Sequence, residues 1–189
     1  RIEGSAPWLA DAQLPENEQA RLTVRVGHAQ REPAANELLI YPRNVLVAVV
    51  GQSIHAAGAI REALRQAAIA VQSVACLLAA DTEMNCSTLR EVAHELGVPL
   101  RFVSAEGAAV ELVRHAIEQP VSIFGDDAIA IAVAEQPLDP LQIGRPRGRL
   151  AVIGLGPGAA ELMVPAVKAE LARANDVLGY ETYVRMAGP

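Results

Sequence analysis

Val45-Leu-Val-Ala-Val-Val-Gly51 is an apolar run that stops at a glycine. A run of this length and composition predicts a buried β-strand. A helix is expected next, because Ile60, Leu64 and Ala67 recur at helical spacing. The apolar run Val74–Ala79 then predicts a second strand. Together these segments predict a βαβ unit, which is the building block of a parallel sheet covered by helices.

Further elements of the same kind extend this unit. The expected elements are a helix over Thr88–Leu96 closed by Gly97, a strand over Pro99–Val103, a helix over Ser104–Glu118 capped by Ser104, and a strand over Ala128–Ala134. The last strand is apolar throughout, which suits burial on both faces of a sheet. We therefore predict, over residues 43–135, a small α/β domain with a parallel sheet in three layers.

The segments on either side of this domain have a different character. Residues 1–42 mix prolines and acids with one alternating stretch, Leu22–Val26. They predict a mostly irregular segment with one strand at that stretch, which could be the tail of a preceding domain. Residues 136–148 contain three prolines and two glycines, which predict an interdomain linker. After it, a strand over Leu150–Ile153 and another over Asp176–Gly179 are expected to flank a helix.

Composition narrows the class of protein. The chain has 189 residues and a net charge of −6, and its arginines are scattered, so a nucleic-acid partner is not expected. The longest apolar runs are much shorter than the roughly 20 residues of a membrane span. Cys76 and Cys86 suggest structural thiols in a reducing cytoplasm. The first residue is Arg1, and no signal peptide follows it, so the chain reads as an internal fragment.

The glycine-rich turn Gly154-Leu-Gly-Pro-Gly158 follows directly on a predicted strand. Glycines permit positive φ and remove Cβ atoms, so the backbone can turn sharply and touch a ligand. By itself the turn is compatible with a dinucleotide site, a phosphate site or a plain connection. Pro165 is expected to begin the following helix, since proline is tolerated at the first helical position. The helix N-terminus then lies away from the turn, which disfavours a pyrophosphate site.

Three segments in this part of the chain resemble a known family. They are Arg149–Gly158, Leu162-Met-Val-Pro165 and Asn175-Asp-Val-Leu-Gly-Tyr-Glu-Thr-Tyr183, and they look like the opening of the tetrapyrrole methylases, most closely the precorrin-3B C17-methyltransferases. The resemblance implies an enzyme with two α/β domains that transfers a methyl group from S-adenosylmethionine to a corrin precursor. It also implies that Pro157, with Gly154, Gly156 and Gly158, contacts the methyl donor.

The same resemblance suggests a role for Glu181. Related methylases carry at this position an Asp proposed as a proton acceptor, and a Glu there could help to remove a substrate proton. A solvated acid without a catalytic role is the alternative. Tyr180 and Tyr183 are expected to pack within the protein or against the tetrapyrrole. The family's later Gly-Asp-Pro motif is expected beyond Pro189, so this methylase domain is predicted to be incomplete and inactive alone.

Residues 43–135 are similar to the C-terminal domain of the cobalt-precorrin-5A hydrolase family. The resemblance rests on the strand that ends at Gly51, on Asp81 after the second strand, and on Leu96-Gly-Val-Pro-Leu100. The family's Gly-x-Gly-Cys turn and basic residues are replaced here by Gly51-Gln-Ser-Ile-His55, and its Asp-x-Lys by Asp81-Thr-Glu83. An anion in place of a cation reverses the local field that an anionic corrinoid would meet. Competent lactone hydrolysis is therefore not expected.

Gly51, His55 and Asp81 remain the candidate substrate-binding residues of this domain. His55 and Asp81 both follow strand ends, so they could meet. With Glu83 they could then form either a general-base pair of side chains or a metal site. The alternative is an exposed loop histidine, and we predict no metal site because a lone histidine lacks a ligand set.

The sequence thus predicts a cobalamin-biosynthesis fusion. In this reading the leading domain binds corrin intermediates ahead of an S-adenosylmethionine-dependent methyltransferase, and other cobalamin-pathway enzymes are possible partners. The alternative is a non-catalytic interaction module that scaffolds those enzymes. A third possibility is residual hydrolase activity that depends on Asp81.

Overall fold

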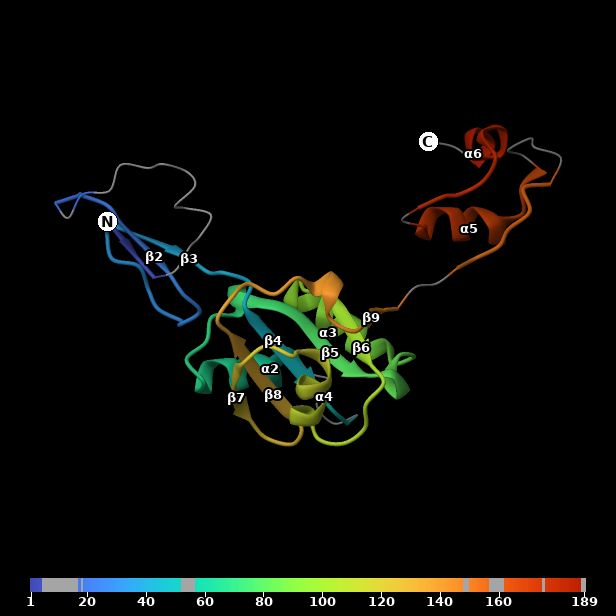
Figure 1. Cartoon of the computed structure of the whole chain (residues 1–189). Coiled ribbons are helices and arrows are strands. Elements are labelled where there is room, and N and C mark those ends of the chain that lie inside the picture. Colours follow the sequence, from blue (N-terminus) through green and yellow to red (C-terminus); the bar gives the residue numbers. More distant parts are fainter. Residues whose placement is uncertain are drawn as a thin grey trace. The chain divides into compact units, whose positions relative to one another are not determined.

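A computed structural model describes residues 1–4, 17, 19–51, 57–147, 150–156, 162–174 and 176–187. The chain is a mixed α/β protein with a small parallel three-stranded sheet and a six-stranded mixed sheet (Figure 1). It divides into two compact units, Arg1–Arg147 and Gly148–Pro189. No helix in the described part of the chain is both long and apolar enough to cross a membrane.

The strands and helices follow one another along the chain in a mostly alternating order. They are β1 (Ile2–Glu3), β2 (Thr23–Val26), β3 (Glu37–Ile40), β4 (Val45–Val49), α2 (Ala57–Gln66), β5 (Val74–Ala80), α3 (Ser87–Leu96), β6 (Leu100–Val103), α4 (Ala109–Ala116), β7 (Val121–Gly125), β8 (Ile129–Ala134), β9 (Arg145–Pro146), α5 (Pro165–Arg173) and α6 (Glu181–Ala187). Short 3₁₀ turns lie at Val71–Ser73 (η2), Asp81–Glu83 (η3) and Pro140–Gln142 (η4).

The six-stranded sheet has the order β7-β8-β4-β5-β6-β9. Its centre, β4-β5-β6, is parallel as predicted. The prediction of a wholly parallel sheet is wrong, because β8 runs antiparallel to β4, β7 to β8, and β9 to β6. For β8 the reason is a hairpin after β7: Asp126 Oδ1 accepts hydrogen bonds from the N–H groups of Ala128 and Ile129, at 2.8 and 2.9 Å, and the chain turns back there. The apolar run of β8 predicts a buried strand but does not indicate its direction. Strand β7, which precedes the hairpin, was not predicted.

The three layers are present in the first unit. Alternate residues of the central strands point to opposite faces. Val45, Val47 and Leu77 pack in one core cluster with α2 and α3, and Leu46 and Leu78 pack in a second cluster with α4. Helices therefore cover both faces of the six-stranded sheet (Figure 1). The clusters are built almost wholly from Ala, Val, Leu and Ile, as the low aromatic content predicts.

The three-stranded sheet occupies the segment expected to be mostly irregular. Its strands β1, β2 and β3 are parallel. Arg25, on the central strand, forms ion pairs with Glu3 on β1 and Glu37 on β3, the latter at 2.8 Å. An isolated β-bridge joins Ala29, just after β2, to Ile69, at the end of the α2 region. Strand β2 confirms the strand predicted over Leu22–Val26. Strands β1 and β3 were not predicted, because they have two and four residues and their pairing with β2 is long-range.

Residues 136–147, for which a linker was proposed, pack against the first unit. Leu138 and Ile143 are buried in the core cluster beneath α4, and β9 pairs with the edge strand β6. The first compact unit accordingly extends to Arg147. The close packing is visible at Gly144, where an added Cβ would lie 2.3 Å from the carbonyl oxygen of Phe102.

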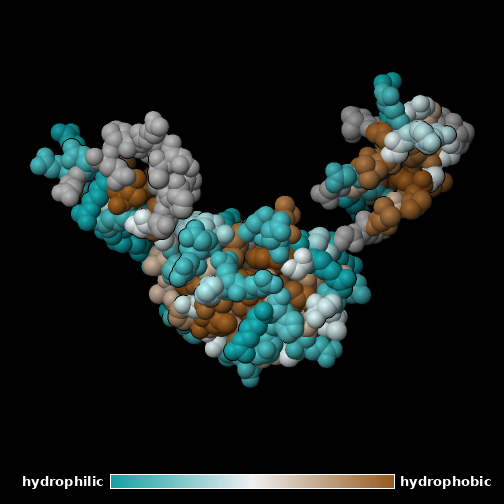
Figure 2. Space-filling model, in the orientation of Figure 1, coloured by the Kyte–Doolittle hydropathy of each residue, from teal (hydrophilic) through white to brown (hydrophobic). Residues whose placement is uncertain are grey.

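The second unit contains two helices in its described part. Helix α5 begins at Pro165, which confirms the predicted helix start. Leu150–Ile153 and Asp176–Gly179, predicted as strands, pair with no strand among the described residues. An apolar pattern indicates an extended chain, but strand pairing also requires a neighbour with matching backbone groups. Figure 2 shows hydrophobic surface gathered on this unit, where Val152 and Leu178 are 90% and 91% exposed.

Candidate functional site

The candidate site of the first unit lies where the parallel strands end. Gly51 follows β4, Asp81 follows β5 and Ser104 follows β6, and these strands are neighbours in the sheet. Because the carboxyl ends of parallel strands share one edge, the residues that follow them come together there. We call this set, with Glu83 and Arg145, the carboxyl-edge site.

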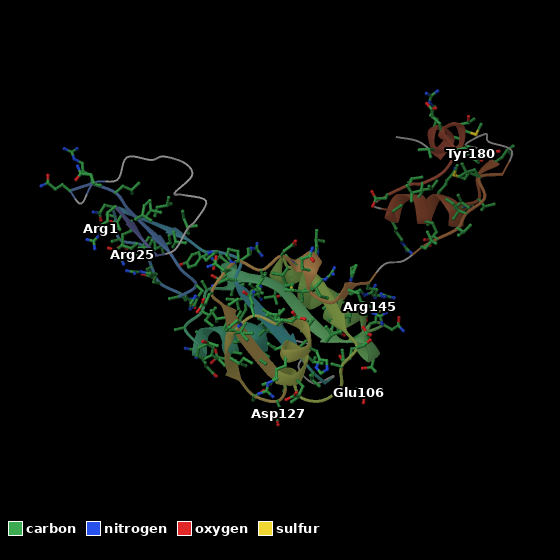
Figure 3. All side chains as sticks on the ribbon, viewed as in Figure 1. Arg1, Arg25, Glu106, Asp127, Arg145 and Tyr180 are labelled. Atoms are coloured by element: carbon green, nitrogen blue, oxygen red, sulfur yellow. The ribbon has the colours of Figure 1, made fainter. Side chains whose placement is uncertain are left out.

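Asp81 is the centre of this site. Arg145 donates to it with two nitrogens, Nε to Oδ1 at 3.0 Å and Nη2 to Oδ2 at 2.5 Å. The hydroxyl of Ser104 donates to Oδ2 as well. The side chain of Asp81 is only 18% exposed, whereas that of Arg145 is 62% exposed and projects from the sheet edge (Figure 3). Both carboxylate oxygens are therefore held by protein donors.

These donors keep Asp81 ionised. The hydrogen bonds from Arg145, and next in size that from Ser104, lower the pKa of the Asp81 carboxyl below its usual value, against a smaller opposing effect of burial. A carboxylate fixed by a guanidinium fork serves as a hydrogen-bond acceptor and an anion rather than as a proton donor.

Gly51 joins the same site through Glu83. Its backbone N–H donates to Glu83 Oε1 at 3.3 Å, and Glu83 belongs to η3, the turn that begins with Asp81. Gly51 has φ of +86°, a conformation that other residues rarely adopt. The structure thus brings two of the three predicted substrate-binding residues, Gly51 and Asp81, to one edge. The third, His55, lies outside the described residues.

Two members of the site were missed by sequence reasoning. Ser104 was expected to cap a helix, but α4 begins later, at Ala109. The hydroxyl of Ser104 instead donates a hydrogen bond to Asp81. Arg145 lies 64 positions beyond Asp81, in a segment that reads as a linker. The one local signal was the pair of arginines two residues apart, Arg145 and Arg147, which places both side chains on one face of an extended segment. Arg147 reaches the same loop and donates to Asn85 Oδ1 at 3.4 Å.

The second unit has a separate hollow around its glycine turn. It measures about 420 Å³, and its lining includes Gly154, Gly156, Tyr180 and Tyr183. Gly156 has φ of +70°, as a sharp turn requires. The two tyrosine rings meet edge to face, with centroids 6.5 Å apart. Pro157 and Gly158, the other predicted cofactor-binding residues, lie outside the described residues.

Glu181 is not among the residues that line this hollow. It begins α6 rather than following a strand, its side chain is 78% exposed, and it forms an ion pair with Arg185 one helical turn later. This geometry is typical of a solvated helix acid, and it brings no other described acid or base to Glu181.

Other reactive groups do not add to either site. Burial raises the pKa of the Cys76 thiol to about 12, which makes it a weak nucleophile. Among the described residues, no three His, Cys, Asp or Glu side chains gather closely enough to hold a metal ion.

The comparisons with known proteins add no relative. No protein-family model, no curated protein and no solved structure matches the chain. Function must therefore be argued from the two sites themselves.

Proposed function

We propose that this chain acts in the biosynthesis of the corrin ring of cobalamin. Its second unit would be the opening of an S-adenosylmethionine-dependent tetrapyrrole methylase, of the precorrin-3B C17-methyltransferase type. Its first unit would bind corrin intermediates without hydrolysing a lactone. The observation that carries the proposal is the hollow in which the glycine turn, Gly154 and Gly156, meets Tyr180 and Tyr183.

The chemistry of the hollow suits a flat, partly apolar ligand. Glycines leave the backbone bare, so a ligand can approach its N–H and C=O groups closely. Tyrosine rings offer flat apolar faces against which an adenine or a tetrapyrrole can stack. Helix α5 begins only at Pro165, so its N-terminus is separated in sequence from the turn, which argues against a pyrophosphate.

The second unit alone is not proposed to methylate. Leu150, Val152, Leu178 and Tyr180 are all more than 80% exposed, and α5 buries none of its described residues. A catalytic domain needs a packed core to hold its groups in place. In the parent enzyme, Pro157 and Gly158 would complete the methyl-donor site. Glu181 would serve as proton acceptor only after its ion pair with Arg185 is broken.

Binding without hydrolysis in the first unit is supported by the state of Asp81. A hydrolase needs a base or nucleophile that is free to react, whereas both oxygens of Asp81 are engaged by Arg145 and Ser104. An anchored carboxylate can still accept hydrogen bonds from a ligand.

A non-catalytic scaffold for corrin-pathway enzymes is the second candidate. One observation favours it: the carboxyl-edge groups Gly51 and Asp81 are already satisfied within the protein, so no ligand is needed to pair them. Absorbance titration separates the candidates, since only a corrinoid-binding unit would shift the spectrum of cobyrinic acid, a corrin with carboxylate side chains.

Calorimetric titration with S-adenosylmethionine tests the second unit. We expect saturable heat from the parent protein and its loss in Gly156→Val, because a β-branched residue is strained at a φ of +70°. Gly27→Val is the matched control, since Gly27 has no close neighbour and no positive φ. Absence of both saturable heat and methyl transfer to precorrin-3B in the parent protein would refute the proposal.

A further inference from the structure

Strand β9 is anchored more firmly than a two-residue strand requires. Arg101, on β6, is only 5% exposed, and its guanidinium donates to the carbonyl oxygens of Ile143 and Gly144 at 2.7 and 2.9 Å. Ile143 is itself buried. A buried charge needs such partners, so these bonds hold the start of β9 against the sheet.

Side chains of β9 and of the residue after it hold the loop of the candidate site. Arg145 begins β9 and Arg147 directly follows it, and residues two apart in an extended chain point to the same side. The two arginines contact Asp81 and Asn85, which belong to the loop between β5 and α3. One short strand therefore connects the sheet edge to the residues of the carboxyl-edge site.

We propose that Arg145, carried into place by β9, is the positioning residue of the carboxyl-edge site. This inference rests on the proposed corrinoid binding. Arg145 fixes the plane of the Asp81 carboxylate through two parallel hydrogen bonds, a geometry specific to arginine.

The proposal also names the chemistry that the ligand meets. Asp81 offers a fixed acceptor for an amide or ring N–H. Nη1 of Arg145 makes no hydrogen bond within the described part of the chain, so it is available to a ligand carboxylate. The cation that the Asp81-Thr-Glu83 sequence lacks is thus supplied from β9, and an anionic corrinoid meets a local field that is not purely negative.

The test uses the whole chain and two readouts. The first is the carboxyl ¹³C titration of Asp81 without ligand, and the second is absorbance titration with cobyrinic acid. Arg145→Gln should raise the pKa of Asp81 and weaken cobyrinic acid binding roughly tenfold or more. Arg145→Lys keeps the charge but cannot form two parallel hydrogen bonds. Compared with Arg145→Gln, it should bring the pKa of Asp81 part of the way back to the wild-type value and restore the affinity for cobyrinic acid to a smaller extent.

Arg65→Gln is the matched control, because Arg65 forms an exposed ion pair with Glu62 on α2 and the charge change is the same. It should leave both readouts unchanged. An unchanged Asp81 titration in Arg145→Gln, or an equal change in Arg65→Gln, would overturn the positioning role. A shifted titration with no binding of cobyrinic acid to any form would instead overturn the proposed function of the first unit.

Discussion

At the residue scale, Ala68 carries backbone strain. It is the non-glycine residue with positive φ in the described part of the chain, at 54°. Its carbonyl oxygen accepts a hydrogen bond from the N–H of Gln30, and the N–H of Ala70 donates back to His28. This turn is the point where the segment after β2 contacts the turn after α2. The positive φ closes helix α2, because the N–H of Ala68 donates to the carbonyl oxygen of Arg65 and the N–H of Ile69 to that of Leu64, the hydrogen bonds of a helix end that glycine usually occupies.

We expect Ala68→Gly to stabilise the first unit. The left-handed conformation costs an L-residue about 1–2 kcal/mol, and the added flexibility of glycine in the unfolded chain offsets part of that, so the net gain is about 0.5–1 kcal/mol. The control, Ala63→Gly in the interior of α2, should lose about 1 kcal/mol. Urea denaturation measures both, and a loss of stability in Ala68→Gly would contradict the strain.

Asp81 makes a second prediction at this scale. Its folded-state pKa is lowered, first by Arg145. Its contribution to stability is therefore present above the unfolded-state pKa of about 3.9 and is lost as pH falls through the folded-state value. The stability difference between wild type and Arg145→Gln should be constant near neutral pH and shrink below about pH 4. Denaturation curves across this range check it, and a difference independent of pH would exclude the ion pair as its source.

At the element scale, β9 turns a proline-rich segment into part of the sheet. Composition could not show this, because a proline at a sheet edge costs no ladder hydrogen bond when its missing N–H would face solvent. What places β9 is the buried guanidinium of Arg101 and the pairing of Arg145 with Phe102, both of which join residues about 43 positions apart. The parallel core β4-β5-β6, in contrast, was predictable from local apolar runs.

Gly144→Ala tests the docking of β9. The glycine has φ of +46°, and a Cβ there would lie 2.3 Å from the backbone oxygen of Phe102. We expect destabilisation on the order of 2 kcal/mol or more and faster hydrogen exchange along β6. Gly58→Ala, in α2 with open space around it, should be neutral or stabilising by up to about 1 kcal/mol. Equal effects of the two substitutions would mean that the close approach is absent.

At the scale of the whole molecule, the first compact unit extends to Arg147. A chain that ends at Glu135 loses the buried side chains of Leu138 and Ile143 as well as β9. Burial of each such side chain contributes about 1.5–3 kcal/mol. The free energy of unfolding of residues 1–135 should therefore be lower than that of residues 1–147 by at least about 3 kcal/mol. Thermal and urea denaturation of the two chains measure this difference. Equal stability of the two chains would show that residues 136–147 do not belong to the folded unit.

The sequence by itself determined the elements whose signal is local. These include the central parallel strands, the helix stop at Gly97 and the start of α5 at Pro165, because apolar periodicity and the φ preferences of glycine and proline act within a few residues. Only the tertiary structure decided the direction of β8, the pairing of β9 and the meeting of Asp81 with Ser104 and Arg145. Contacts between residues tens of positions apart depend on how elements pack, and no short pattern encodes that packing.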